Sequence, residues 1–331
     1  MAGGSVKPAR RSPKGISVSK TSLGTFDECE RKWALGYRPW LLPPEMEREA
    51  RLQHKLMPFP ALVGQVVDDT ITAGLRLYHR KGYWPKDWHA GARDLLAQYW
   101  KASAEWIRAA ETGGDLPELR RQPVDRVFFG EPLSEAENAR LLERIDESLD
   151  VFLASEVRDW AAGFDVAMWE LPQSGETPWF LWDGIPVWAK YDFAIRTPER
   201  TYLVDWKTGK IDVASAREQL HIYAAYAIET WSVPRDQLTL RTVWLAAGPE
   251  SCVNDEEVDV DVLGRLYAQF RERHALLTAR DAEARKGPGA LFEQFPKTGF
   301  PNRCRWCAFR VCEGYAEALR LRSEGEASAG A

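Results

Sequence analysis

The stretch Leu203-Val204-Asp205-Trp206-Lys207-Thr208-Gly209 carries more information than any other in the chain. It places a carboxylate and an ammonium group at the end of an apolar run that starts at Tyr202 and stops at a Thr-Gly breaker. Alternate residues of a strand face the same side of a sheet, so we expect Asp205 and Lys207 to project together. The sequence therefore predicts a buried strand with an acid and a lysine at its end.

An earlier acid, Asp192, lies in another strand-like run, residues 186–195. The turn at residues 197–200 would join this run to the first one as a hairpin and bring Asp192 and Asp205 to one point. Two carboxylates and a lysine suit a hard divalent metal ion and a phosphate. The alternative for an Asp-x-Lys pair at a strand end is a solvated rim or a surface ion pair.

Composition limits the classes of function. The chain has 331 residues, a formal net charge of −5 and a pI near 5.7, which argue against coating duplex DNA through bulk charge. No apolar run is long enough to span a bilayer, and residues 1–16 are expected to form a flexible basic arm, so we expect a cytoplasmic protein without a membrane segment. Five cysteines, an odd number, do not indicate a disulfide framework, which leaves metal ligation as their expected use.

Periodicity predicts helices first and strands later in the chain. Ser19 would cap the first helix, in which Cys29 falls. The expected helices cover residues 17–35, 59–78, 88–111, 134–162, 213–231 and 259–285. The expected strands cover residues 164–171, 178–182, 186–195, 202–207 and 238–245, the first four as an antiparallel meander. This order predicts an α/β fold in which a mixed β-sheet is flanked by helices and carries a helical insertion.

The acids fit phosphodiester hydrolysis, which needs an activated water and charge neutralisation on the phosphate. Asp192 and Asp205 are the candidate ligands for Mg²⁺ or Mn²⁺, with Asp68 and the backbone carbonyl of Trp206 as further oxygen ligands. Lys207 would orient the water or stabilise the developing charge. Asp68 equally fits the solvated side of its helix.

Two residues of the helix at 213–231 are four apart and share a face, Gln219 and Tyr223. They would hydrogen-bond a phosphate or a base near the metal, or Tyr223 would only pack on the sheet. His221 between them is expected at the surface.

The cysteines form a second constellation. Cys304-x2-Cys307-x4-Cys312 supplies three thiolates in one loop, and Cys29 and Cys252 are the remaining donors for a fourth position. Spacing alone fits zinc and an iron-sulfur cluster equally. Ligation by Cys29 would join the N-terminal and C-terminal regions and act as a structural staple.

Taken together, three blocks of residues resemble the PD-(D/E)XK nucleases of the RecB type, which have a restriction-endonuclease-like core. The blocks are Ser19 to Trp33 with Cys29; Asp192, Asp205-x-Lys207 and Gln219-x3-Tyr223; and Cys304, Cys307 and Cys312. The branch with an iron-sulfur staple, which includes the CRISPR-associated RecB-like exonucleases and the AddB nuclease domain, is the most similar. The resemblance covers both ends of the chain and residues 164–230, but not the region of about 80–160.

The resemblance implies a role for each matching position. Asp192 and Asp205 would be the metal-binding acids, Lys207 the catalytic lysine, and Gln219 with Tyr223 the helix motif that follows. The four ligands of a [4Fe-4S] cluster would be Cys29, Cys304, Cys307 and Cys312, which leaves Cys252 as a bystander.

Three positions depart from the family pattern. Asp68 stands where many relatives have histidine, Ala189 replaces a glycine before the first acid, and Glu30 replaces a proline after the first cysteine. An acid still ligates a hard metal, so the first change affects metal preference rather than the expectation of activity.

The function that follows is a metal-dependent DNA nuclease, expected to be an exonuclease on single-stranded ends in DNA repair, recombination or phage DNA processing. A helicase or a recombination protein is a candidate partner. The alternatives are an inactive nucleic-acid-binding or scaffold protein on the same fold and a nuclease that processes DNA in CRISPR adaptation. We expect one nuclease domain at 17–322, with an insertion at about 80–160, a catalytic core at 164–246, a cluster-binding segment at 300–315 and a disordered tail at 323–331.

Overall fold

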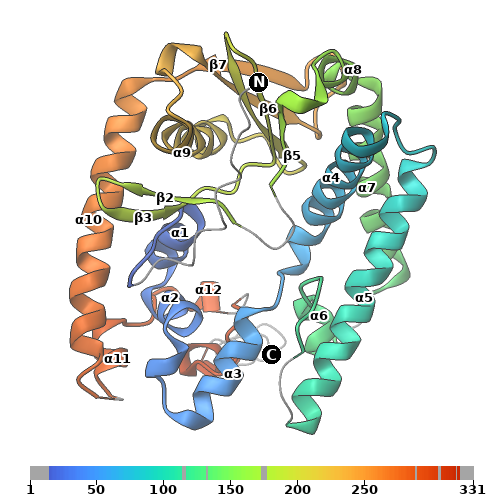
Figure 1. Cartoon of the computed structure of the whole chain (residues 1–331). Coiled ribbons are helices and arrows are strands. Elements are labelled where there is room, and N and C mark those ends of the chain that lie inside the picture. Colours follow the sequence, from blue (N-terminus) through green and yellow to red (C-terminus); the bar gives the residue numbers. More distant parts are fainter. Residues whose placement is uncertain are drawn as a thin grey trace, which may run out of the picture. The chain divides into compact units, whose positions relative to one another are not determined.

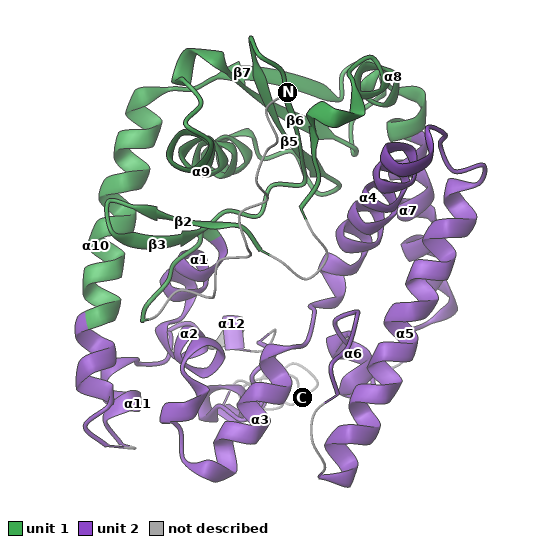
Figure 2. Ribbon diagram, in the orientation of Figure 1, with its two compact units in different colours: residues 1–20, 151–278 green, residues 21–150, 279–331 purple. Residues whose placement is uncertain are grey.

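A computed structural model describes residues 15–113, 117–131, 133–172, 177–287, 289–304, 307–317 and 319–320. The predicted tail and almost all of the predicted basic arm lie outside these residues. The chain divides into two compact units, which Figure 2 distinguishes by colour. Unit 1 comprises residues 1–20 and 151–278, and unit 2 comprises residues 21–150 and 279–331.

Unit 1 is built on a mixed five-stranded sheet in the order β1-β4-β5-β6-β7, of which Figure 1 labels β5, β6 and β7. Strands β4 and β5 form the predicted antiparallel hairpin, and β5 runs parallel to β6. A parallel neighbour requires a crossover, and helix α9 provides it between β5 and β6. The bounds are β1 Trp169–Glu170, β4 Phe193–Arg196, β5 Thr201–Lys207, β6 Leu238–Trp244, β7 Val253–Glu257 and α9 Val213–Trp231.

Helices cover both faces of the central strands, which explains why β4, β5 and β6 are buried along most of their length. Helix α9 packs against β5 and β6 on one face. On the other face, Trp160 of α8 (Val157–Ala162) meets the Tyr202 ring at 5.3 Å, and Phe152 meets the Trp206 ring at 5.9 Å. Odd-numbered residues of β5 therefore point towards α9, and even-numbered residues point away from it.

A separate two-stranded sheet lies beyond α9. Strands β2 (Trp179–Trp182) and β3 (Ile185–Trp188) pair antiparallel around Asp183 and Gly184, which have φ values of 47° and 83°. An Asp-Gly pair tolerates two positive φ values, so this tight turn follows from its sequence. Strand β2 packs on α9, where Phe180 lies edge-on to Tyr226 at 5.9 Å. Helix α9 is thus held between two sheets.

The predicted strand at 186–195 was wrong as a single element. Strand β3 ends at Trp188 and pairs with β2, whereas β4 begins at Phe193 and pairs with β5. Ala189 donates its N–H to the Pro178 carbonyl at 2.9 Å, and the next residues carry the chain to the other sheet. Asp192 therefore lies just before β4 rather than within a strand.

The predicted antiparallel meander was also wrong, because its strands divide between two sheets. The run at 164–171 forms a 3-10 turn, Val166–Met168, followed by the two residues of β1. Strand β7 was not predicted. It is an edge strand with a polar, mostly exposed sequence, Asn254-Asp255-Glu256-Glu257, which lacks the apolar alternation of a half-buried strand.

Unit 2 is helical within the described residues. Helix α4 packs against α5, and Gly74 of α4 allows the Trp88 ring to lie directly on its backbone. The helices are α1 Lys20–Glu28, whose first residue belongs to unit 1, α2 Glu30–Tyr37, α3 Pro44–His54, α4 Leu62–Lys81, α5 Trp88–Thr112, α6 Asp125–Phe128, α7 Glu135–Ala154, α10 Val260–Ala284, α11 Ala290–Gln294 and α12 Pro301–Cys304. The boundary between the units falls within α7 and α10. None of the helices in the described ranges is long and apolar enough to cross a bilayer.

Two predicted helices are interrupted. The helix at 17–35 breaks at Cys29, which separates α1 from α2 and caps α2 with its sulfur, an acceptor for Lys32 N–H at 3.5 Å. The helix at 134–162 breaks at Ser155, whose hydroxyl turns back to the Phe152 carbonyl at 2.8 Å. Both residues satisfy backbone groups with their own side chains, which favours helix ends.

The second unit draws its interior from both of its chain segments. Trp33 of α2 stacks on Phe295 at 5.4 Å, and the buried Arg31 donates to the Phe295 carbonyl at 2.7 Å and to Glu313 at 2.7 Å. Arg38 pairs with Asp281 at 2.7 Å. The N-terminal helices therefore complete their core with residues from the last part of the chain.

Candidate active site and cysteine pocket

The end of β5 presents an acid and a lysine on the face covered by α9. Asp205 is 1% exposed, and its Oδ2 lies 2.6 Å from Lys207 Nζ. The side chain of Lys207 keeps 27% exposure, so the pair runs from the interior of the sheet to its edge. The predicted side-by-side projection of Asp205 and Lys207 is present.

Helix α9 closes a ring around this pair. Lys207 Nζ donates to Gln219 Oε1 at 2.7 Å, and Gln219 Nε2 donates to the Tyr223 hydroxyl. The Tyr223 hydroxyl in turn lies 3.5 Å from Asp205 Oδ1. Gln219 and Tyr223 reach the sheet together because residues four apart share one helix face.

Asp192 joins the same edge through the backbone. Its Oδ2 accepts the Trp206 N–H at 2.8 Å, which holds this carboxylate beside the residue between Asp205 and Lys207. The indole of Trp206 packs on the opposite face. The N–H of Trp206 therefore positions Asp192, while the side chain of Trp206 anchors the strand.

Burial controls the electrostatics. It raises the pKa of Asp205, and the neighbouring Lys207 ammonium opposes this rise. Burial, Asp205 and Asp192 together raise the pKa of Tyr223 well above its ordinary value. Both carboxylates act on one phenol, which stays protonated and serves as a hydrogen-bond donor.

The carboxylates of Asp192 and Asp205 meet some, but not all, of the requirements of a site for a hard divalent metal ion. No described residue gives Asp205 Oδ2 an aligned hydrogen bond, although the oxygen is buried and Lys207 contacts it by charge. Such an oxygen suits Mg²⁺ or Mn²⁺. Across the described ranges, however, no group of three or more His, Cys, Asp or Glu side chains is arranged to hold a metal ion as it stands. Asp68 lies on α4 in unit 2, with Gln65 Nε2 3.5 Å from its Oδ2, and its ligand role and that of the Trp206 carbonyl stay predictions.

Four cysteines of unit 2 line one small pocket. Cys29 contributes the N-cap of α2, Cys304 the end of α12, and Cys307 and Cys312 the segment that follows. Lys32, Leu35, Lys297, Phe309 and Tyr315 complete the lining. None of the five cysteines forms a disulfide, and Cys252 lies in unit 1, where its sulfur contacts the Pro249 carbonyl at 3.3 Å.

Burial makes these thiols weak acids. It raises the pKa of Cys304, that of Cys307 to about 11 and that of Cys312 to about 12. A methyl group on Gly314 would lie 3.1 Å from Cys304 Sγ and 3.7 Å from Cys312 Sγ, so a glycine leaves room for both sulfurs. The sulfurs converge on one pocket without standing at ligand spacing.

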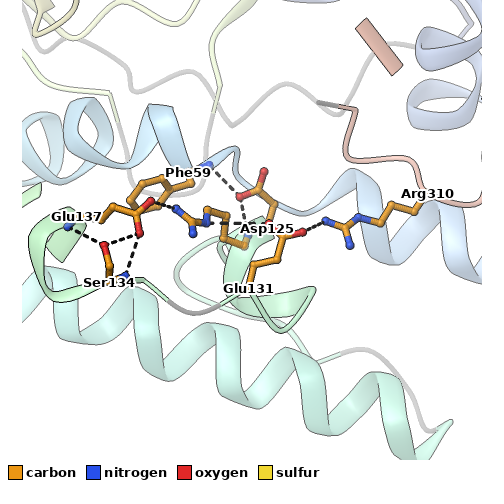
Figure 3. A network of polar contacts seen from close by, with 7 residues as sticks. Phe59, Asp125, Glu131, Ser134, Glu137 and Arg310 are labelled. Atoms are coloured by element: carbon orange, nitrogen blue, oxygen red, sulfur yellow. Dashed lines mark hydrogen bonds and ion pairs between the residues drawn. The ribbon is translucent and has the colours of Figure 1, made fainter. Parts of the chain in front are cut away.

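A polar network anchors the segment that carries these cysteines (Figure 3). Arg310 pairs with Glu131, and its guanidinium lies 3.4 Å from the centre of the Phe129 ring. Nearby, Ser134 and Glu137 exchange hydrogen bonds as a capping box at the start of α7. Hydrogen bonds from Arg126 and Ser134 lower the pKa of Glu137 to about 2.

Sequence reasoning missed one cation and misplaced one histidine. Lys20 Nζ reaches Ser215 and Glu218 in the first turns of α9, a contact across 195 residues that no local pattern predicts. His221, expected at the surface, is fully buried: its Nδ1 bonds the Arg217 carbonyl at 2.7 Å, and its Nε2 accepts the Asp259 N–H at 2.9 Å.

The sequence model of the PD-(D/E)XK nuclease superfamily matches residues 17–312, which span both units and include β5, α9 and all five cysteines. No curated protein matches the chain. The match covers most of the chain and runs through the strand end and helix described above. The chain therefore belongs to the PD-(D/E)XK nuclease superfamily.

Proposed function

We propose that this protein is a metal-dependent DNA nuclease of the RecB-like branch that hydrolyses phosphodiester bonds at the end of β5. One observation carries the proposal: Asp205, Lys207, Gln219 and Tyr223 form a closed ring of contacts, and Asp192 is tied to the same strand end. A surface ion pair would not need a buried acid, a glutamine clamp and a phenol donor.

In the proposed reaction, a water oxygen attacks phosphorus, the opposite P–O bond breaks, and the leaving oxygen takes a proton. A divalent ion held by Asp192 and Asp205 would neutralise charge on the phosphate and make a nearby water more acidic. Lys207 has three N–H donors; Gln219 accepts one of them, and Asp205 Oδ2 lies 2.6 Å from the ammonium as its ion-pair partner. A further N–H would bind a phosphate oxygen or the attacking water, where it would stabilise developing charge.

Gln219 and Tyr223 act as positioning residues in this scheme. Gln219 fixes the lysine ammonium, and its other end binds a phenol that remains a neutral donor because its pKa is raised. Tyr223 is itself directed at Asp205. This arrangement restricts the acid and the lysine to one relative geometry, as catalysis by orientation requires.

For the second unit we propose a [4Fe-4S] cluster bound by Cys29, Cys304, Cys307 and Cys312, with zinc as the alternative. The shared pocket and the glycine at 314 support a bound group at this point. The thiols would lose their protons on binding, since thiolates are the ligands. The cluster would staple residue 29 to residues 304–312 and take no part in hydrolysis.

We further propose that single-stranded DNA ends are the substrate. The chain carries a net charge of −5, so binding would depend on a local site rather than on a broad basic face. The test is degradation of linear and circular DNA, each single-stranded and duplex, with Mg²⁺, Mn²⁺ or EDTA. We expect metal-dependent loss of linear single strands and survival of circles. Failure to cleave any of these DNAs with either metal would reject the nuclease proposal.

A further inference from the structure

We propose that Lys20 is a second substrate-contacting cation at this site, whose ammonium group binds a DNA phosphate next to the one that is cleaved. The inference rests on the proposed function, because it takes the end of β5 as the place where the DNA strand lies. It adds a residue that lies far from the catalytic residues in sequence.

The first step is the position of the ammonium group. Lys20 Nζ contacts Ser215 Oγ at 3.1 Å, the Ser215 carbonyl, and Glu218 Oε2 at 3.2 Å. Glu218 precedes Gln219, the residue that holds Lys207. Two lysines that are far apart in sequence are therefore held by adjacent residues of α9.

The second step is charge. Burial lowers the pKa of Lys20, Glu218 opposes this, and the Lys207 ammonium lowers the pKa further. The Lys20 charge also acts on Asp205. Two ammonium groups thus lie close enough to influence each other and the central acid, as in a site built for a polyanion.

The third step is rigidity. The segment before Lys20 is fixed to β3: Val18 N–H donates to the Pro186 carbonyl, and the Val18 carbonyl accepts Trp188 N–H, both at 2.9 Å. The indole N–H of Trp188 also donates to Ser17 Oγ at 2.9 Å. Lys20 therefore extends from a paired backbone, so that binding a ligand would not have to order the main chain before it.

The fourth step is accessibility. The Lys20 side chain retains 29% exposure and the Glu218 side chain 51%. Glu218 can turn into solvent and leave the ammonium to an incoming phosphate, whereas the alternative is a purely structural Lys20–Glu218 tie. Neutralising Glu218 distinguishes a phosphate-binding Lys20 from a structural one. In the first case it removes a group that competes with the phosphate for the ammonium, and in the second it breaks the structural ion pair.

The experiment measures binding of a labelled single-stranded oligonucleotide in EDTA by fluorescence anisotropy over a range of salt concentrations. Each lost phosphate contact lowers the slope of log K against log salt by about 0.7 for a single strand. Lys20→Gln should lower the slope by this amount, Lys20→Arg should keep it, and Glu218→Gln should tighten binding. Lys101→Gln, at an exposed position of α5, is the control for loss of one positive charge.

The contact is overturned if Lys20→Gln keeps the wild-type slope, if Glu218→Gln weakens binding as Lys20→Gln does, or if the wild type shows no salt-dependent binding. Since EDTA prevents cleavage, the two proposals fail separately. If Lys20→Gln lowers the salt slope but the wild type never cleaves DNA, the nuclease proposal is rejected and the phosphate contact of Lys20 is kept. If the wild type cleaves DNA with metal but Lys20→Gln leaves the salt slope unchanged, the phosphate contact of Lys20 is rejected and the nuclease proposal is kept.

Discussion

The side-chain oxygen of Gln219 accepts a hydrogen bond from the ammonium group of Lys207 at 2.7 Å. Strand β5 alone would leave this lysine a choice of rotamers, because its side chain extends to the edge of the sheet. The contact from α9 removes that freedom and directs the ammonium towards Asp205. The proposed chemistry therefore depends on the helix as much as on the strand.

Replacing Lys207 should remove cleavage without unfolding the protein. Lys207→Met keeps the length of the side chain and loses the charge, so we expect the rate of metal-dependent cleavage to fall by about 100-fold or more. Gel assays with end-labelled DNA measure the rate, and circular dichroism checks the fold. Lys286→Met, an exposed lysine on a turn in unit 2, should cleave like the wild type. Comparable cleavage by Lys207→Met would show that the lysine is not catalytic.

Replacing Asp205 should stabilise the metal-free protein. A buried carboxylate costs folding free energy, and Asp205→Asn removes its charge, so we expect the free energy of unfolding to rise by on the order of 1 kcal/mol. Mg²⁺ should raise the melting temperature of the wild type and leave that of Asp205→Asn unchanged. Asp236→Asn, at an exposed acid, should change neither quantity. A less stable Asp205→Asn protein would mean that the Lys207 pair outweighs the burial cost.

The cysteines should separate into four ligands and one bystander. Cys307→Ser should bleach the brown colour expected of an iron-sulfur protein, lower its iron content and destabilise unit 2, because a staple between distant segments is lost. Cys252→Ser should keep colour and iron, since Cys252 lies in unit 1. Iron and sulfide analysis measures the outcome. A colourless wild type with one bound zinc would instead support the zinc alternative.

Acid should destabilise unit 1 through His221. Burial lowers its pKa below the ordinary value of 6.5, so between the two pKa values the unfolded state binds a proton that the folded state rejects. Stability is therefore full above pH 6.5 and falls as the pH drops towards the folded pKa. His221→Gln should flatten this part of the pH profile in urea melts, whereas His79→Gln, at an exposed histidine, should not. Identical profiles for all three proteins would contradict this assignment.

The contact of α4 with α5 predicts opposite effects for two glycines. A methyl group on Gly74 would overlap the Trp88 ring, so Gly74→Ala should lower the free energy of unfolding by about 1 to 3 kcal/mol despite its better helix propensity. Gly91→Ala, in α5 with nothing within 4 Å, should gain up to about 1 kcal/mol. Urea melts of both variants measure the difference. A stable Gly74→Ala protein would show that the Trp88 ring can shift.

Sequence patterns predicted the helices and strands whose boundaries are set by neighbouring residues. Helix α9 has the predicted bounds, because the Asp212 side chain caps its first turn, and the β4–β5 hairpin follows from the turn at 197–200. The passage from β3 to β4 was not predicted, since Ala189 and Tyr191 are buried like the strand residues on either side, and no Gly or Pro separates the two strands. Spacing on one strand and one helix predicted the shared faces of Asp205 with Lys207 and of Gln219 with Tyr223, and the structure brings these four side chains into contact.

Contacts that depend on distant backbone stayed hidden. His221 lies inside because Arg217 and Asp259 satisfy both of its nitrogens, and a hydropathy pattern does not record such partners. Lys20 likewise gains its place only when Val18 pairs with β3. The placements that the sequence did not predict depend on hydrogen bonds between distant parts of the chain, and the type of side chain does not reveal them.

Unit 2 is made of two separate segments of the chain, so it can complete its fold only after the second segment has been synthesised. The buried guanidinium of Arg31 finds its acceptors at Phe292, Phe295 and Glu313, which the ribosome adds long after Arg31. Residues 151–278 emerge in one continuous run before them. A nascent chain thus has all of unit 1 before unit 2 can close, and a ribosome that stops short of residue 292 releases a chain whose Arg31 has none of these acceptors.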